Sequence, residues 1–124
     1  MNIIHAPISV GELLDKISIL EIKLINTTNQ NKIFNIQNEL KILNELYSEL
    51  SLELNDLYLK LKHINETIWN AEDSIRELEK QQNFGQEFID AARSIYINND
   101  LRAFIKRQVN IISESHIIEE KCYD

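Results

Sequence analysis

Hydrophobic residues recur every three or four positions over most of this chain, which is the spacing of one face of an α-helix. The longest run of this pattern spans about residues 31–81, where neither Gly nor Pro interrupts it. Its apolar positions are Ile33, Ile36, Leu40, Leu43, Tyr47, Leu50, Leu54, Leu57, Leu61, Ile64, Ile68, Ala71, Ile75 and Leu78. The pattern predicts one very long helix, whose stripe of about 45 residues would measure ~70 Å.

The segment "YSELSLELND" offers an alternative to that continuous helix. Ser and Asn favour helix caps over helix interiors, so a break near Ser48–Asn55 would divide the helix into two. Because the apolar stripe passes through this segment without a gap, we favour an unbroken or gently bent helix.

The segment "ISVGELL" contains the clearest local signal for the start of a helix. Ser9 has the position of an N-cap, and Glu12, three residues later, completes a capping box. Ile8 and Leu13 have the spacing of a hydrophobic staple around that cap. We therefore predict a helix over about residues 9–25, buried on more than one side, although "KISILEIKL" also alternates like a β-strand.

Two shorter helices and a tail are predicted after the long helix. Asn83 and Gln86 repeat the capping pattern, so a third helix is expected over about residues 84–97. The segment "NND" indicates a turn, and a fourth helix is expected over about residues 100–113. Residues 114–124 are short and charged, so we expect an extended tail. The inward positions of the fourth helix would be Leu101, Phe104, Ile105, Val109 and Ile112.

The fold class is thus all-α: a four-helix, bundle-like single domain with short helices packed at the two ends of a very long one. Its 124 residues are enough for one domain with a single core. The net charge of −7, without a cluster of Lys and Arg, argues against nucleic acid and an anionic membrane surface as partners. No stretch approaches the ~20 apolar residues of a membrane span. With one cysteine and no leader-like N-terminus, the chain is expected to be cytoplasmic.

The segment "NETIWNAEDSIRELE" places five acids and an arginine around the only tryptophan. At 100° per residue, three of these acids point away from the apolar stripe and are expected to be solvated. The remaining polar side chains follow one edge of the stripe: Asn65, Glu72, Arg76 and Glu79. The simplest interpretation of this edge is an intrahelical ion pair between Glu72 and Arg76, worth ~0.3 kcal/mol.

A second interpretation makes this edge part of a site for a small anionic ligand. All four arginines lie in the last 50 residues, and Arg is suited to bidentate contacts with carboxylates and phosphates. Gln108 projects from an apolar helix face, where a buried amide must find a structural partner or a ligand. The candidate ligand-binding residues are Glu72, Arg76, Arg93, Arg102 and Gln108.

No metal site, cofactor or catalytic residue is predicted. Glu12 and Asp15 have the one-face spacing of carboxylates in magnesium sites, but such sites need several inward oxygens, and we expect these acids to be solvated. His5, His63 and His116 are isolated in the sequence, and no Gly-rich phosphate loop is present.

The middle of the long helix is expected to be an oligomer interface. Short helices at its ends would leave "LSLELNDLYLKL" uncovered, and monomers rarely expose so large an apolar patch. Pairing of two copies about a two-fold axis would cover it. The candidate interface residues are Leu50, Leu52, Leu54, Leu57, Leu59 and Leu61.

Three parts of the chain carry a resemblance to a known family: "APISVGELLDKISILEIKL", "WNAEDSIREL", and "FGQEFIDAARSIYINNDLRAFIKRQVN" with "EEKCY". The chain resembles a small family of bacterial and phage proteins catalogued as a domain of unknown function. The resemblance covers most of the chain, and it implies a soluble helical domain connected with surface-polysaccharide synthesis. It implies no catalytic residue.

Two classes of function follow from the sequence. The favoured one is a non-enzymatic assembly or adaptor protein that acts as a homodimer through the middle of the long helix. The alternative is an enzyme or binding protein that uses the Arg and Glu residues to hold a small anionic ligand.

Overall fold

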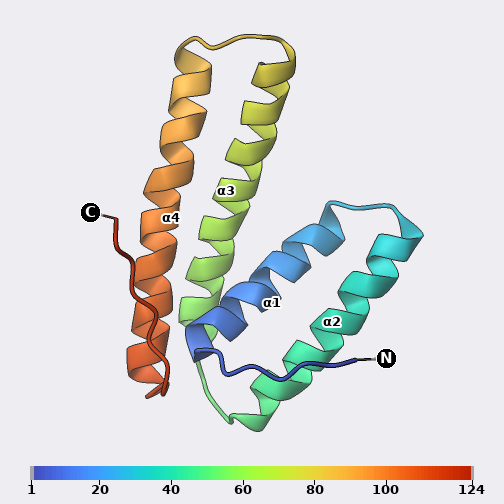
Figure 1. Ribbon diagram of the computed structural model, residues 1–124, viewed down its shortest axis with the longest axis vertical. Helices are drawn as coiled ribbons and strands as arrows, with labels where there is room; N and C mark the ends of the chain where they lie inside the picture. The colour runs from blue at the N-terminus through green and yellow to red at the C-terminus, as the bar shows by residue number, and fades with distance from the viewer. Residues whose placement is uncertain (1, 124) are drawn as a thin grey trace.

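Four α-helices account for the regular structure in the computed structural model, which describes residues 2–123 (Figure 1). They are α1 (Val10–Ile25), α2 (Gln30–Glu49), α3 (Asn55–Lys80) and α4 (Gln86–Ile112). No strand occurs in the described residues, so the predicted all-α class with four helices is confirmed. None of these helices combines the length and the apolar character needed to cross a bilayer.

α1 begins at the capping signal, and it is a helix rather than the alternative strand. The Ser9 side chain accepts a hydrogen bond from the backbone N–H of Glu12 at 3.0 Å, which satisfies one of the free donors of the first turn. The Glu12 carboxylate accepts a hydrogen bond from Lys106 Nζ of α4 at 2.7 Å. α1 is buried on several sides through Leu13, Leu14, Ile17, Leu20 and Ile22.

The predicted single helix over residues 31–81 is wrong, because the structure divides it into α2 and α3. Between them Ser51 has a φ of 52°, a left-handed conformation that an α-helix does not contain. Tyr47 stabilises this turn by donating a hydrogen bond to the carbonyl of Leu52 at 3.3 Å. The break lies in the Ser48–Asn55 segment, which was the alternative, and it allows α2 to pack on α1 while α3 pairs with α4.

The two helices predicted over residues 84–97 and 100–113 are also wrong, because α4 runs through both without a turn. Asn98 remains helical and donates from its side chain to the carbonyl of Ser94 at 2.8 Å. Asn and Asp cost a helix less than ~0.7 kcal/mol each relative to Ala, so packing along the whole length of α3 outweighs them.

Only part of the predicted inward face of α4 is buried. Ile105 and Val109 are 8% and 0% exposed, and they join the core. Leu101, Phe104 and Ile112 are instead 48%, 57% and 62% exposed. The prediction that these three residues face inward is wrong. The surface of α4 that contacts α3 and α1 is narrower than the row of apolar residues in its sequence.

The helices form two antiparallel hairpins, α1–α2 and α3–α4, which lie at an angle to each other (Figure 1). α1 contacts the other three helices, whereas α2 contacts only α1 among them. α2 accordingly has no fully buried residue. Its five stripe positions face inward and are half-buried: Ile33, Ile36, Leu40, Leu43 and Tyr47.

The core lies where α1 crosses the base of the α3–α4 hairpin. Each aliphatic side chain buried there contributes roughly 1.5–3 kcal/mol to folding. Its buried apolar members are Leu14, Leu54, Leu61, Ile105 and Val109.

α1 is too short to cover the whole α3–α4 hairpin. It has 16 residues and measures ~24 Å, whereas α3 and α4 have 26 and 27 residues and measure ~40 Å. We call the distal part of the hairpin, residues 71–98, the arm; Figure 1 shows it standing clear of α2. Residues 113–123, the tail, contain no helix and fold back along α4 (Figure 1).

Candidate functional site

The carboxylate of Asp15 is the most buried charged group of the described residues, with 1% of Asp15 exposed. Arg102 binds it with two nitrogens: Nε donates to Oδ1 at 2.9 Å, and Nη2 donates to Oδ2. Asn65 Nδ2 also donates to Oδ1 at 2.9 Å. One carboxylate therefore joins α1, α3 and α4, in the bidentate geometry that makes a buried ion pair favourable.

Ser18 completes this cluster one turn along α1. Its hydroxyl donates to the backbone carbonyl of Asp15 at 2.8 Å and accepts from Asn65 Nδ2 at 2.7 Å. The prediction that Asp15 is solvated is wrong, because the hairpin covers the face of α1 that carries it. Residues 2–123 contain no group of three or more His, Cys, Asp or Glu side chains arranged to hold a metal ion.

Lys106 extends the cluster toward the N-terminus of α1. Its Nζ donates to Glu12 at 2.7 Å and to Glu119 at 3.3 Å, and it lies 3.9 Å from Asp15 Oδ2. Burial alone lowers the pKa of Lys106, but the hydrogen bond to Glu12 and the surrounding carboxylates outweigh burial and raise it. The hydrogen bond to Asp15 likewise raises the pKa of Arg102. Both side chains therefore stay charged at neutral pH.

A second polar contact ties α1 to α3. Tyr58 donates its hydroxyl hydrogen to Glu21, and Lys62 Nζ lies 3.2 Å from the other oxygen of Glu21. Burial, and then the hydrogen bond to Glu21, raise the pKa of Tyr58 above its ordinary value of 10.0. The phenol therefore acts as a hydrogen-bond donor at all physiological pH values.

α1 approaches α4 closely at Gly11. A Cβ at this position would lie 2.6 Å from the backbone oxygen of Lys106, closer than real Cβ atoms come. The Gly11 N–H donates to Asn110 Oδ1 at 2.6 Å. Asn110 is 1% exposed, yet its Nδ2 has no hydrogen-bond partner within the described chain. A buried donor left unpaired costs about 1–3 kcal/mol, so this nitrogen is an unusual feature of the site.

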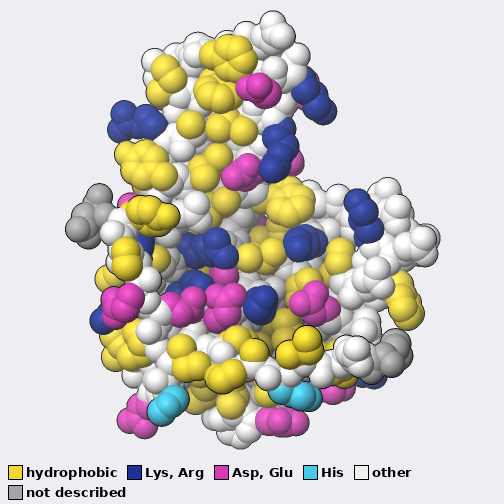
Figure 2. All heavy atoms as spheres, viewed as in Figure 1, with side chains coloured by type: hydrophobic (Ala, Val, Ile, Leu, Met, Phe, Trp, Pro, Cys, Tyr) yellow, Lys and Arg dark blue, Asp and Glu magenta, His cyan; other side chains and the backbone are white. Residues whose placement is uncertain are grey.

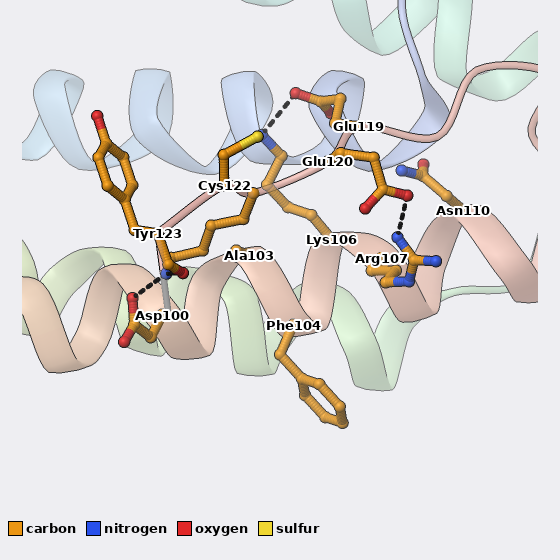
Figure 3. Close-up of a pocket in the computed structure, with 11 residues that line it drawn as sticks. Asp100, Ala103, Phe104, Lys106, Arg107, Asn110, Glu119, Glu120, Cys122 and Tyr123 are labelled. Carbon is orange, nitrogen blue, oxygen red and sulfur yellow. Dashed lines mark hydrogen bonds and ion pairs between the residues drawn. The ribbon is translucent and has the colours of Figure 1, made fainter.

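The tail covers this end of α1 and closes a cleft against α4 (Figure 3). Ser9 Oγ donates to Glu119 Oε1 at 2.7 Å, and the Val10 N–H donates to Ser115 Oγ at 3.2 Å. The cleft has a volume of about 960 Å³. Its lining includes Asp100, Lys106, Arg107, Asn110, Glu119 and Lys121.

Two further ion pairs hold the tail along α4. Arg107 lies 2.7 Å from Glu120, and Lys121 lies 3.0 Å from Asp100. Figure 3 shows Arg107 of α4 and Glu120 of the tail reaching toward each other. The tail is therefore attached by charges at its surface and by the two contacts to the start of α1.

Comparison with known protein families matches residues 4–124 to DUF6165, which is described as a family of unknown function. The chain belongs to this family. No curated protein and no solved structure matches the chain. The resemblance to a domain of unknown function expected from the sequence is thereby confirmed, and the family adds no residue role to the geometry described above.

The predicted ligand-binding residues do not form one cluster in this member of the family. Glu72 and Arg76 form the simple intrahelical pair, at 3.6 Å, with side chains 38% and 70% exposed. Arg93 is exposed on α4. Arg102 faces Asp15 of α1 instead of the Glu72 edge.

Gln108 cannot share a network with Glu72. Asn65 and Arg102 meet at Asp15 and so mark one level of the hairpin. Glu72 lies seven residues from that level toward the tip, and Gln108 lies six residues from it in the other direction. At 1.5 Å per residue, about 20 Å of hairpin separate the two side chains. Gln108 was expected to be buried on an apolar helix face, and in the structure it is only half-buried.

The predicted exposure of the leucine segment is wrong for its central residues. Leu54 and Leu61 are 5% and 0% exposed and belong to the core of the chain itself. Leu52 and Leu57 pack against that core. Leu50 and Leu59 remain 40% and 54% exposed, and an interface through these two residues stays a prediction.

Sequence reasoning missed the central members of the site: Asp15, Ser18, Lys106 and Asn110. One signal for Asp15 was present, because it lies between Leu13, Leu14 and Ile17 on a helix that the pattern marks as buried on several sides. Asn65 was placed correctly on the edge of the apolar stripe. Its contact with α1 could not be found from helix periodicity, because that contact depends on how the two hairpins cross.

Proposed function

We propose that this protein is a non-enzymatic assembly protein that forms a homodimer through its arm. One observation carries the proposal. α1 contacts α3 and α4 near Asn65 and Arg102 and reaches Trp69 and Asn70 of α3. Apart from α3 and α4 themselves, no other described helix packs on the same face of the arm, which we call the open groove. A second copy of the arm is the occupant that we infer.

The walls of the open groove follow from helix periodicity. On α4, Arg102 and Lys106 face α1. Residues three or four positions apart share a helix face, so the same face can be followed from Arg102 toward the tip of the hairpin. On α3, the face of Asn65 continues along the polar edge described above. Figure 2 shows hydrophobic side chains in a column along the arm, with acidic and basic side chains on the α3 side of it. The continuing positions are Phe88, Ala92 and Ile95 on α4, and Ile75, Glu72, Arg76 and Glu79 on α3.

The charges on the α3 edge are self-complementary. In a two-fold arrangement with the arms antiparallel and face to face, α3 lies along the α3 of the partner, centred midway along the arm. Glu72 then faces the partner's Arg76, and Arg76 faces the partner's Glu72. The exposed intrahelical pair becomes a network of four charges, and the apolar side chains of α4 meet their own copies.

The size of the arm sets the expected strength of the dimer. The arm is ~20 Å long, and its two helices side by side are ~20 Å wide. Its projected area is therefore ~400 Å² per chain. Specific interfaces bury about 800 Å² of accessible surface per partner, so this dimer is at the lower end of the range. Interfaces of standard size have dissociation constants from micromolar to picomolar, so we expect this smaller one to lie at about the micromolar end.

The buried charges favour assembly over catalysis as the function. Arg102 is engaged with Asp15 and Lys106 with Glu12, and these contacts hold α1 on the hairpin. Because these charged side chains already bind one another, we assign them a structural role. They give rigid support to the arm that projects beyond them. A connection with surface-polysaccharide synthesis stays a prediction from the resemblance, and no residue of the arm adds to it.

Sedimentation of variants across a concentration series tests the dimer. Ile95→Glu places a charge in the open groove, and it should raise the dissociation constant at least tenfold. Leu59→Glu lies on α3 away from the arm and alters the interface predicted through Leu50 and Leu59, so it should leave the constant unchanged if the arm forms the dimer. Equal effects of the two variants would contradict an interface through the arm.

A charge exchange gives a second test of the proposed orientation. Glu72→Arg alone places like charges opposite each other and should weaken the dimer. The double variant Glu72→Arg/Arg76→Glu restores the complementary pattern and should recover most of the affinity. If the double variant is as weak as the single one, the antiparallel pairing of α3 with α3 is wrong.

A further inference from the structure

The unpaired nitrogen of Asn110 lies beneath the tail, beside the place where Glu119 reaches the start of α1. In Figure 3 the amide of Asn110 faces the tail segment that carries Glu119 and Glu120. Ser9 Oγ and Lys106 Nζ donate to the two oxygens of Glu119, at 2.7 Å and 3.3 Å. Donors from α1 and α4 thus converge on a carboxylate, and one buried donor next to them has no acceptor.

The tail that supplies this carboxylate is held by partly buried contacts at Ser9, Val10 and Lys106 and by exposed ion pairs along α4. The Glu119 side chain is 44% exposed, and Arg107 and Glu120 are 47% and 69% exposed. Ion pairs at this exposure contribute little and are screened by salt. The core lies among α1, α3 and α4, so the tail can lift without disturbing it.

We propose that Ser9, Lys106 and Asn110 form a binding site for the carboxylate group of a small molecule, and that Glu119 occupies this site as an internal ligand. When the tail lifts, the Ser9 hydroxyl and Lys106 Nζ lose Glu119, and the Val10 N–H loses Ser115. The Nδ2 of Asn110 becomes accessible at the same moment. The free carboxylate of a ligand then accepts from these groups in place of Glu119.

Lys106 Nζ keeps its contacts with Glu12 and Asp15 when Glu119 leaves, so the added attraction for an anion comes from two other sources. The positive end of the α1 dipole points at this place, and Arg107 at the rim is released from Glu120 together with the tail. The tail supplies residues 119–123 of the lining of the cleft, so lifting the tail opens the remaining wall, on α4, to the rest of the ligand.

Competition by the tail makes a specific prediction. A ligand that binds only when the tail is lifted shows an affinity reduced by the fraction of molecules in that state. Removing the side chain of Glu119 should therefore strengthen binding of an external carboxylate. This inference does not depend on the dimer, because the cleft lies at the opposite end of the hairpin from the tip of the arm.

Titration of the isotope-labelled full chain with acetate, followed by nuclear magnetic resonance, tests the site. The readouts are the side-chain amide of Asn110 and the backbone amide of Val10, with sodium chloride at matched ionic strength as the reference. Glu119→Ala should show saturable shifts of both signals, with an apparent dissociation constant about fivefold or more below that of the unmodified chain. Glu120→Ala, in the same tail, is the matched control and should behave like the unmodified chain.

Three outcomes would overturn the proposal. They are shifts that do not saturate in Glu119→Ala, equal affinities in Glu119→Ala and the unmodified chain, or the same gain in Glu120→Ala. Inorganic phosphate is titrated in parallel, and saturable binding of phosphate without binding of acetate would show that the site does not select a carboxylate. Adding Lys106→Met to Glu119→Ala should abolish the saturable shifts, and persistence of these shifts would remove Lys106 from the site.

Discussion

Arg102 and Asp15 are separated by 87 positions in the sequence, and they form the bidentate contact that fixes α1 on the hairpin. Asp15 comes from the first helix and Arg102 from the last, and Asn65 of α3 joins them at the same carboxylate. This contact fixes the place where α1 crosses the hairpin. It therefore also decides which part of the arm stays open.

Removing the carboxylate should destabilise the fold strongly. Asp15→Ala leaves the guanidinium of Arg102 half-buried without its partner, and breaking a buried pair in this way costs about 3–5 kcal/mol. Urea unfolding followed by circular dichroism measures the loss. Glu72→Ala, which removes one partner of an exposed pair, is the control and should cost less than ~0.5 kcal/mol. Similar losses in the two variants would mean that Asp15 does not anchor α1.

The close approach at Gly11 gives a second prediction. Gly11→Ala adds a Cβ that would lie 2.6 Å from a backbone oxygen of α4, so the two helices must separate. Overpacking of this kind costs about 1–3 kcal/mol. Gly85→Ala is the matched control, because its nearest contact is a side-chain oxygen at 3.3 Å and its φ is −79°. A smaller loss of the unfolding free energy in Gly11→Ala than in Gly85→Ala would contradict the packing described.

The free energy of unfolding should fall when the pH rises above about 10. The pKa of Tyr58 is raised in the folded chain from an ordinary value of 10.0, and the pKa of Lys106 is raised as well. Above the ordinary pKa the unfolded chain releases a proton that the folded chain keeps, so the unfolded state gains stability with increasing pH. The stabilisation is fully present below that pH and is lost above it.

Tyr58→Phe should make this alkaline decline shallower, because the phenol no longer contributes to it. Tyr96→Phe changes an exposed tyrosine, 55% exposed, and should keep the full decline. Urea midpoints measured from pH 8 to pH 11 provide the comparison. Identical slopes for the two variants would show that burial and the hydrogen bond to Glu21 do not hold the Tyr58 proton in the folded chain.

The sequence predicts the helical class and the start of α1 because both depend on local chemistry. The cap at Ser9 is a contact between neighbours, and it is present at 3.0 Å. The break at Ser51 was harder to find, because the apolar positions keep their spacing on both sides of it. A stripe that stays in register gives no sign that the backbone leaves the helix between two of its members.

The candidate site depended on contacts that periodicity does not encode. Arg102 was selected as an arginine for anion recognition, and its partner is a carboxylate of the chain itself, on α1. The sequence gives no measure of the angle at which α1 crosses the hairpin. That angle also determines which part of the groove remains uncovered, so the arm could not be identified as a surface before the crossing was known.

The mass of the unmodified chain in solution tests the central claim most directly. Light scattering at a concentration on the order of 100 µM, well above the expected micromolar dissociation constant, should give twice the chain mass of 14.6 kDa. Dilution should return the mass toward that of one chain. A mass of 14.6 kDa at the highest concentration would contradict the dimer, and with it the proposed role of the arm.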